Sequence, residues 1–330
     1  MRKFLKISGI IFAVILFILL IGYGYIMTQY PKSLPAPDMK ITATPQMYER
    51  GKYLANTFAS CTDCHSDRNP DKFGNPLIES TIGKGGQDYG EGAGYVPASN
   101  ITSDKETGIG NWTDGEIFRA ITMGIDKKGE ALGPMMPYLY FRNMDEEDVK
   151  SIIVYIRSLP PIRNEVKEHK FNFPVNLIFR TLPTAPDFKK KPDENNTIAL
   201  GEYYSGGCLS CHSPMEKGEF INDKLYSGGV EYPAPKGGIV RSGNITPDKE
   251  TGIGNWSKEQ FIQKFRAFKN PEVTNVTVNE NEFNTVMPWT FYADATDADL
   301  GAVYDFLMTQ KPVNHKVEKF SPKDKYNPNN

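Results

Sequence analysis

The sequence predicts an all-α protein in which two tandem helical domains follow one N-terminal transmembrane helix. Three observations carry this prediction: an uncharged apolar run near the N-terminus, a duplication of most of the remaining chain, and apolar residues spaced as in amphipathic helices. The 330 residues carry a formal net charge of -2 and contain no long run of like charge, so no nucleic-acid partner is expected.

The N-terminal run at residues 7–27 contains no charged side chain. About 20 apolar residues cross a bilayer as an α-helix, and no small-residue cleavage pattern follows the run. We therefore expect residues 1–30 to be an uncleaved membrane anchor, with a signal peptide cleaved in "GYGYIM" as the alternative. Three basic residues precede the run and Lys32 follows it, so the positive-inside rule keeps the N-terminus in the cytoplasm and exports the rest of the chain.

The duplication is plainest in a glycine-containing loop, because "NITSDKETGIGNW" at Asn100 returns as "NITPDKETGIGNW" at Asn244. Stretches before each cysteine pair, and a later Met-Pro-aromatic stretch, recur in the same order. A period this long indicates tandem globular domains and not a solenoid. The predicted parts are a domain at 40–165, an interdomain segment at 166–193, a second domain at 194–318 and a disordered tail at 319–330.

Helix signals occur at matching places in the two copies. Thr113-x-x-Glu116 and Ser257-x-x-Gln260 both fit a capping box. Near the end of each copy, apolar residues at i, i+3, i+4 and i+7 give a helix one buried stripe, and a proline then stops the helix. Long loops rich in glycine, proline and asparagine connect these helices, so we expect a bulky buried group to organise each domain.

The four cysteines all lie in two C-x-x-C-H motifs. Such a core serves as a redox dithiol, as half of a zinc site, or as the attachment point of a c-type haem when His follows directly. Zinc is disfavoured because the two halves lie in different copies, and a thioredoxin-like dithiol because no βαβ pattern surrounds them. A structural disulfide leaves His unexplained. Haem attachment uses every residue: Cys61, Cys64 and His65 in the first copy, and Cys208, Cys211 and His212 in the second.

Cytochromes of this kind use Met as the axial ligand opposite His, which raises the reduction potential. The predicted second axial ligands here are Met136 and Met287. A single Met is normally a packing residue. Here Met-Pro-aromatic recurs before the last helix of both copies, which reverses that expectation. Met135 is the rival of Met136, but only Met136 aligns with Met287 through the following proline. The sequence thus predicts two covalently attached haem c groups.

Together these motifs resemble the class I c-type cytochromes, and more closely the multihaem cytochrome c subunits of membrane-bound, alcohol-type dehydrogenases. The resemblance covers most of 45–160 and 195–312. It implies two tandem class I cytochrome c domains, each with three or four helices around a haem. It also implies a relay of single electrons from a membrane-bound dehydrogenase or quinol-oxidising respiratory complex to a soluble cytochrome or terminal oxidase. Such subunits usually carry three haem motifs, so two motifs and an N-terminal anchor leave the partner open.

The expected function is accordingly an electron carrier on the periplasmic side of a bacterial cytoplasmic membrane, with no catalytic residues of its own. With both axial positions filled, neither iron offers a substrate site. The rival is a dihaem enzyme such as a peroxidase, in which one haem opens. An insertion at 270–284, just before Met287, is where such an opening or a docking loop is expected.

Two further features have open interpretations. Trp112 and Trp256 begin the capped helices and are either hydrogen-bond donors to a haem propionate or aromatic core residues. The interdomain segment contains "FNFPVNLIFRTLPTAP", which is too apolar for a free linker. We expect it to lie across the domain surfaces and hold the haems at a fixed separation.

Overall fold

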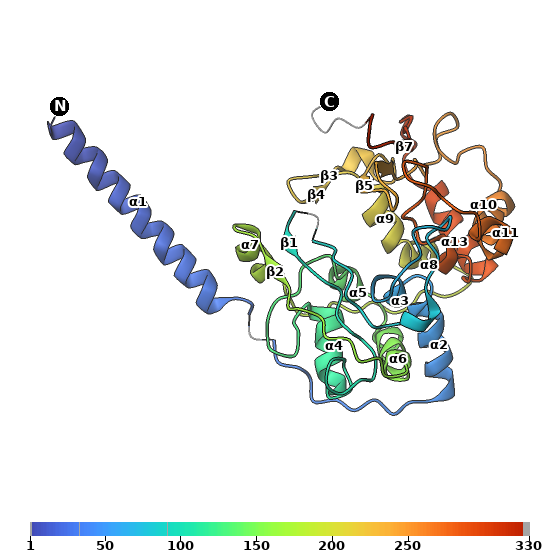
Figure 1. The fold of residues 1–330 in the computed structure, drawn as a ribbon, viewed down its shortest axis with the longest axis horizontal. Helices are drawn as coiled ribbons and strands as arrows, with labels where there is room; N and C mark the ends of the chain where they lie inside the picture. Colours follow the sequence, from blue (N-terminus) through green and yellow to red (C-terminus); the bar gives the residue numbers. More distant parts are fainter. Residues whose placement is uncertain (1, 33, 91, 326–330) are drawn as a thin grey trace.

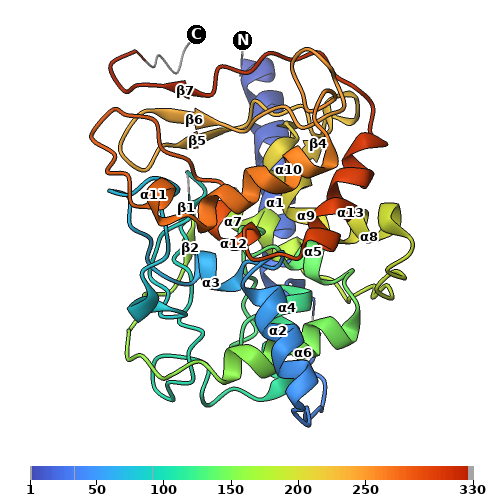
Figure 2. The same ribbon diagram turned by 90° about the vertical axis from the view of Figure 1, so that its right-hand side faces the viewer.

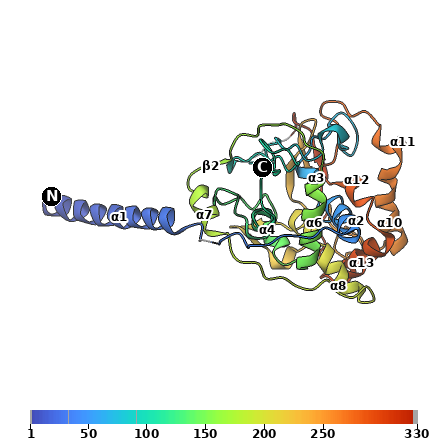
Figure 3. The same cartoon turned by 90° about the horizontal axis from the view of Figure 1, so that it is seen from below.

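The computed structural model describes residues 2–32, 34–90 and 92–325 (Figure 1). Helix α1 (Arg2–Gln29) extends away from the rest of the molecule, and its apolar window is fully exposed (Figures 1 and 3). In the described part of the chain it is the one helix that is long and apolar enough to cross a membrane. That finding agrees with the predicted anchor by length and composition.

The remaining helices repeat in order in the two halves of the chain (Figure 2). The second half has one further 3-10 turn, just before its insertion, and one further helix within the insertion. The first half contains α2 (Pro45–Ala55), α3 (Cys61–Cys64), η1 (Glu79–Thr81), α4 (Asp114–Met123), α5 (Tyr138–Phe141) and α6 (Glu146–Arg157). The second half contains α8 (Thr197–Tyr204), α9 (Gly206–His212), η2 (Asn222–Lys224), α10 (Lys258–Arg266), η3 (Ala267–Lys269), α11 (Pro271–Thr274), α12 (Trp289–Tyr292) and α13 (Asp297–Met308).

Both predicted capping boxes are confirmed. The Thr113 hydroxyl accepts from the Glu116 N–H, while the Glu116 carboxylate accepts from the Thr113 N–H. Ser257 and Gln260 make the same pair of bonds at the start of α10. Each box satisfies two donors that a helix N-terminus otherwise leaves unpaired, which explains why α4 and α10 begin at the same place in their copies.

A close helix crossing forms the centre of each half, where α2 packs on α6 and α8 packs on α13. Gly51 lies at the first crossing, and a Cβ atom there would be 1.8 Å from the Ser151 carbonyl oxygen. Gly201 occupies the same place in the second crossing, where an added Cβ atom would be 2.0 Å from the Ala302 carbonyl oxygen. Both contacts are far shorter than van der Waals distance, so only glycine lets the two helices approach this closely.

Short strands accompany the helices, so the prediction of an all-α protein is incomplete. They are β1 (Gly94–Tyr95) paired with β2 (Lys170–Phe171), β3 (Met215–Glu216) paired with β4 (Glu219–Phe220), and the sheet of β5 (Glu231–Pro233), β6 (Ile239–Arg241) and β7 (Phe320–Ser321), all antiparallel. Strands of two or three residues are too short to show the alternating pattern by which a strand is predicted.

Two of these strands change the predicted boundaries. Strand β2 lies in the segment predicted to be interdomain, yet Phe171 pairs with Gly94 of the first half. Strand β7 lies in the tail predicted to be disordered, yet Phe320 pairs with Val240 and Ser321 is buried. The prediction of disorder is therefore wrong for these two residues, and 326–330 fall outside the described residues.

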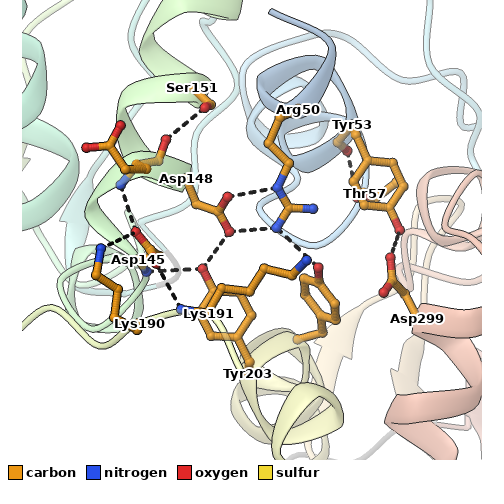
Figure 4. A network of polar contacts seen from close by, with 12 residues as sticks. Arg50, Tyr53, Thr57, Asp145, Asp148, Ser151, Lys190, Lys191, Tyr203 and Asp299 are labelled. Atoms are coloured by element: carbon orange, nitrogen blue, oxygen red, sulfur yellow. Dashed lines mark hydrogen bonds and ion pairs between the residues drawn. The ribbon is translucent and has the colours of Figure 1, made fainter. Parts of the chain in front are cut away.

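The two halves share one connected core of buried apolar residues, and a polar network joins them beside it (Figure 4). Arg50 of α2 donates to both oxygens of Asp148 on α6, at 2.8 and 2.6 Å. From α8, Tyr203 donates to the same carboxylate at 2.7 Å, and the Tyr204 hydroxyl accepts from Arg50 at 3.1 Å. Tyr53 also donates to Asp299 on α13. A largely buried ion pair is thus satisfied only when both halves are in place.

The insertion of the second half also contacts the first half. Phe73 N–H donates to the Val276 oxygen at 2.9 Å, and Val278 N–H donates to the Asp71 oxygen at the same distance. Asn284 is fully buried, donates to the Lys72 oxygen at 3.0 Å and accepts from Gly74 N–H at 3.0 Å. The insertion is thus bonded to the other half of the molecule, and its role as a docking loop or in haem opening stays a prediction.

We expect Gly51→Ala and Gly201→Ala to destabilise the protein, because each methyl group would force a helix crossing apart. Overpacking of this kind typically costs ~1–3 kcal/mol. The matched control is Gly301→Ala on α13, where the nearest atom is the flexible Lys258 Cδ at 3.3 Å, and where alanine favours the helix. Chemical denaturation measures all three. Equal stabilities of Gly51→Ala and Gly301→Ala would contradict the crossing geometry.

Candidate haem sites

The two cysteines and the histidine of each motif are brought together by one helical turn. Cys61 and Cys64 are the first and last residues of α3, and His65 is its C-cap residue. Residues three and four apart lie on the same face of a helix, so both thiols and the imidazole face one side. Cys208, Cys211 and His212 have the same spacing at the end of α9.

Each imidazole is held by one main-chain carbonyl. His65 Nδ1 lies 2.6 Å from the Ser99 oxygen, and His212 Nδ1 lies 2.7 Å from the Gly243 oxygen. A carbonyl oxygen can only accept, so Nδ1 carries the proton and Nε2 keeps its lone pair. Histidines that bind metals are typically oriented in this way by a second partner. Burial also lowers the pKa of both imidazoles, against the opposing effect of the carbonyl, and this favours the neutral form that binds metal.

The repeated loop positions these carbonyls. The Asn100 side-chain oxygen, next along the chain from Ser99, accepts from Thr102 N–H at 3.0 Å and from its hydroxyl at 2.7 Å. The Asn100 amide donates to the Ile162 oxygen at 2.8 Å. Asn244 makes the same set of bonds in the second half, to Thr246 and to the Val313 oxygen. The repeated polar residues therefore hold the loop and tie it to the segment that follows the last helix.

Most of the cysteine thiols lie in apolar surroundings. Burial raises the pKa of Cys61, Cys64 and Cys208 to about 12. A reactive dithiol requires the thiol pKa to move the other way. No three His, Cys, Asp or Glu side chains gather as a metal site within the described residues. The raised pKa disfavours the dithiol interpretation, and the lack of a gathered ligand set among the described residues disfavours zinc.

The two predicted methionine ligands occupy the same turn in the two halves. Met136 precedes α5 and Met287 precedes α12, and their carbonyls accept from Tyr138 N–H at 2.7 Å and Trp289 N–H at 2.8 Å. Both side chains are half-buried against the core, as are Cys61 and Cys208. The role of Met136 and Met287 as axial ligands stays a prediction.

A buried hydroxyl beside the first methionine turn supports the fit to a cofactor. Tyr138 is fully buried, and its hydroxyl has no hydrogen-bond partner among the described residues. An unpaired buried hydroxyl typically costs ~1–3 kcal/mol, so a polar group of a bound molecule is expected there. Together with paired thiols, an imidazole with a free Nε2 and a half-buried thioether, the residues present fit haem c.

Sequence reasoning missed two tyrosines that pack on the second motif, Tyr140 from the first half and Tyr292 from the second half itself. The Tyr140 ring lies 2.2 Å from where a Cβ of Gly206 would be, and the Tyr292 hydroxyl lies 2.5 Å from that of Gly207. Both glycines precede Cys208 on α9, so aromatic rings pack directly on the backbone of the second motif. The glycine pair before Cys208 was the available signal, since glycine marks close approach.

The first motif has a different neighbour. Its Asp63 is buried and pairs with Arg68 at 3.0 Å, while the Arg68 guanidinium lies 5.9 Å from the centre of the Phe291 ring of α12. Burial raises the pKa of Asp63, although Arg68 opposes that effect. The second motif has Ser210 in the place of Asp63, so only the first motif carries this charged contact with the other half.

The tryptophans differ from each other. Trp112 is half-buried against the core, whereas Trp256 is 36% exposed. Their main-chain oxygens accept from Arg157 at 2.6 Å and from the Tyr304 hydroxyl at 2.6 Å, each time from the last helix of the same half. A role as propionate donors stays a prediction.

No family model matches the chain. It is 28% identical to a gluconate 2-dehydrogenase cytochrome c subunit of Pantoea cypripedii, over 69% of this chain and 52% of that protein. It is 27% identical to the cytochrome c subunit of an alcohol dehydrogenase (quinone) of Gluconacetobacter polyoxogenes, over 82% of this chain and 57% of that protein. A fructose dehydrogenase cytochrome subunit of Gluconobacter japonicus is 28% identical, over 72% of this chain and 48% of that protein. The chain spans about half the length of these relatives. It resembles the cytochrome c subunits of membrane-bound dehydrogenases, as its repeated motifs predict.

Proposed function

We propose that this chain is a membrane-anchored dihaem c-type cytochrome that relays single electrons from a membrane-bound dehydrogenase to a downstream acceptor. The observation that carries the proposal is the imidazole held by a carbonyl directly behind both cysteine pairs. The relatives support electron transfer, since they are named as cytochrome subunits of dehydrogenases. The acceptor is proposed to be a soluble cytochrome or a terminal oxidase.

The residues that would hold the first haem are Cys61 and Cys64 through thioether bonds, with His65 and Met136 as axial ligands. For the second haem, the corresponding residues are Cys208, Cys211, His212 and Met287. When bound, each haem supplies a one-electron iron couple, whose potential a Met ligand and a buried site raise. The protein's own part is to fix the imidazole, to place both cysteines beside it and to keep the two sites rigid.

The two halves are proposed to be tandem class I cytochrome c domains. The matching helix crossings and matching loop bonds support this proposal, and the strand pairings extend the domains to about 171 and 321. The aromatic contacts support a relay between them. Phe58, just before the first motif, stacks on Tyr204, just before the second, with ring centroids 4.2 Å apart. These rings connect the two cysteine segments directly.

The location proposed for both domains is the periplasmic side of a bacterial cytoplasmic membrane, with α1 as a single-pass anchor. The apolar, fully exposed surface of α1 and the basic residues before it support this placement.

Met136→His should leave the haem covalently attached and lower the midpoint potential of one of the two centres. Exchanging Met for a second His removes the ligand that stabilises the reduced iron, within a range of about 0.8 V that axial ligands set. A potentiometric titration followed by absorbance measures the change. Met135→His, at the adjacent position, is the control and should titrate like the wild type. A shift in Met135→His alone would assign the ligand to Met135.

Gly228→Ala should damage the second site through the carbonyl that holds its imidazole. Gly228 has φ +72°, and a Cβ there would be 2.4 Å from the Gly243 oxygen, which accepts from His212. Left-handed geometry alone costs an alanine about 1–2 kcal/mol. The measurements are the midpoint temperature of thermal unfolding and the haem absorbance per chain, and both values should be lower than in the wild type. Gly243→Ser is the control, since its Cβ meets open space and the first half already has Ser99 there. Equal behaviour of the two variants would exclude this support.

A further inference from the structure

The apolar interdomain segment does not lie across both halves as expected. Beyond β2, it forms helix α7 (Val175–Thr181), which lies beside the C-terminal end of α1 (Figures 1 and 3). Arg180 connects the two elements, since its Nε and Nη2 donate to the Tyr30 oxygen at 2.9 and 2.6 Å. Arg180 also pairs with Glu130 of the first half at 3.1 Å. The segment is therefore fixed to the point where the predicted membrane span ends.

The apolar side chains of this segment point in two directions. The rings of Phe171 and Phe179 pack edge to face with centroids 5.0 Å apart, and both side chains are half-buried. Phe173 and Ile178, by contrast, are 75% and 54% exposed. Exposed apolar side chains concentrated in one short segment typically mark a surface that something else covers. Sequence reasoning correctly found the segment too apolar for a linker, but its apolar surface faces outward.

We propose that the segment 172–181, which we call the α7 face, inserts into the lipid interface on the exterior side of the membrane. The inference rests on the proposed role of α1 as a membrane anchor. Its support is continuity: the exposed apolar surface of α1 runs through Tyr23 and Tyr25 to Met27, and the α7 face begins where that surface ends. Any group bonded to Tyr30 must lie near the headgroups if α1 spans the bilayer. Short apolar helices with aromatic residues bind at that depth.

This placement has a consequence for the first half. The first half carries β1, which pairs with β2, and Glu130, which pairs with Arg180. A membrane-inserted α7 face therefore holds the first half against the bilayer by two attachments, α1 and α7.

The test uses the purified full-length protein with haem, in liposomes, with a nitroxide spin label on one introduced cysteine. The native cysteines are held in thioether bonds if the proposed function is right, so the unmutated protein should take no label. Ile178→Cys and Phe173→Cys report the α7 face. Ile15→Cys, in the middle of α1, reports the bilayer interior. Val276→Cys is the matched control, since it is 52% exposed and lies on the second half.

Relaxation by oxygen, which partitions into lipid, is compared with relaxation by a water-soluble nickel complex. Labels at 178 and 173 should respond more to oxygen, between the values at 15 and at 276. Water-like values at 178 and 173 with a lipid-like value at 15 would overturn the inference and leave the anchor intact. A water-like value at 15 would instead refute the anchor. Shielding at 178 that appears only after membrane extract is added would show a protein-docking face and also overturn the inference.

Discussion

The closest approach of two helices in each half is the constraint on which the sites depend. Gly51 and Gly201 have no side chain, so α2 and α8 press against the backbones of α6 and α13. The chain leaves each crossing directly toward its cysteine motif, and α6 and α13 end at the segment to which the repeated loop is bonded. The same crossing thus sets where the thiols start and where the carbonyl behind the imidazole is held.

Two nearly equal sites are joined by unequal contacts. Arg50 and Asp148 belong to the first half, yet their bonds are completed by tyrosines of the second. Arg68, which pairs with Asp63, lies over the Phe291 ring, and the insertion of the second half is bonded to the first half. Separating the halves would take two tyrosine hydroxyls away from a largely buried ion pair and expose the shared apolar core, so the halves are expected to stay together. A fixed separation is what a relay of single electrons between two centres needs.

The helices, their caps and the face shared by each Cys-Cys-His set could be predicted, because the order and spacing of side chains along the sequence determine them. The acceptors of His65 and His212 could not, because they are main-chain oxygens of different residues, Ser99 and Gly243. Two-residue strands leave no pattern, which is why β2 and β7 were missed. The direction of the apolar interdomain segment depends on where α1 ends, which no local pattern encodes.

The central claim is that each Cys pair holds a haem covalently. The intact mass of the denatured chain purified from its own membranes, measured before and after treatment with a thiol-alkylating reagent, tests it most directly. The account predicts a mass raised by two haem groups and no alkylated cysteine. An unmodified mass with alkylation of Cys61, Cys64, Cys208 and Cys211, all of which the structure shows as free of disulfides, would contradict it.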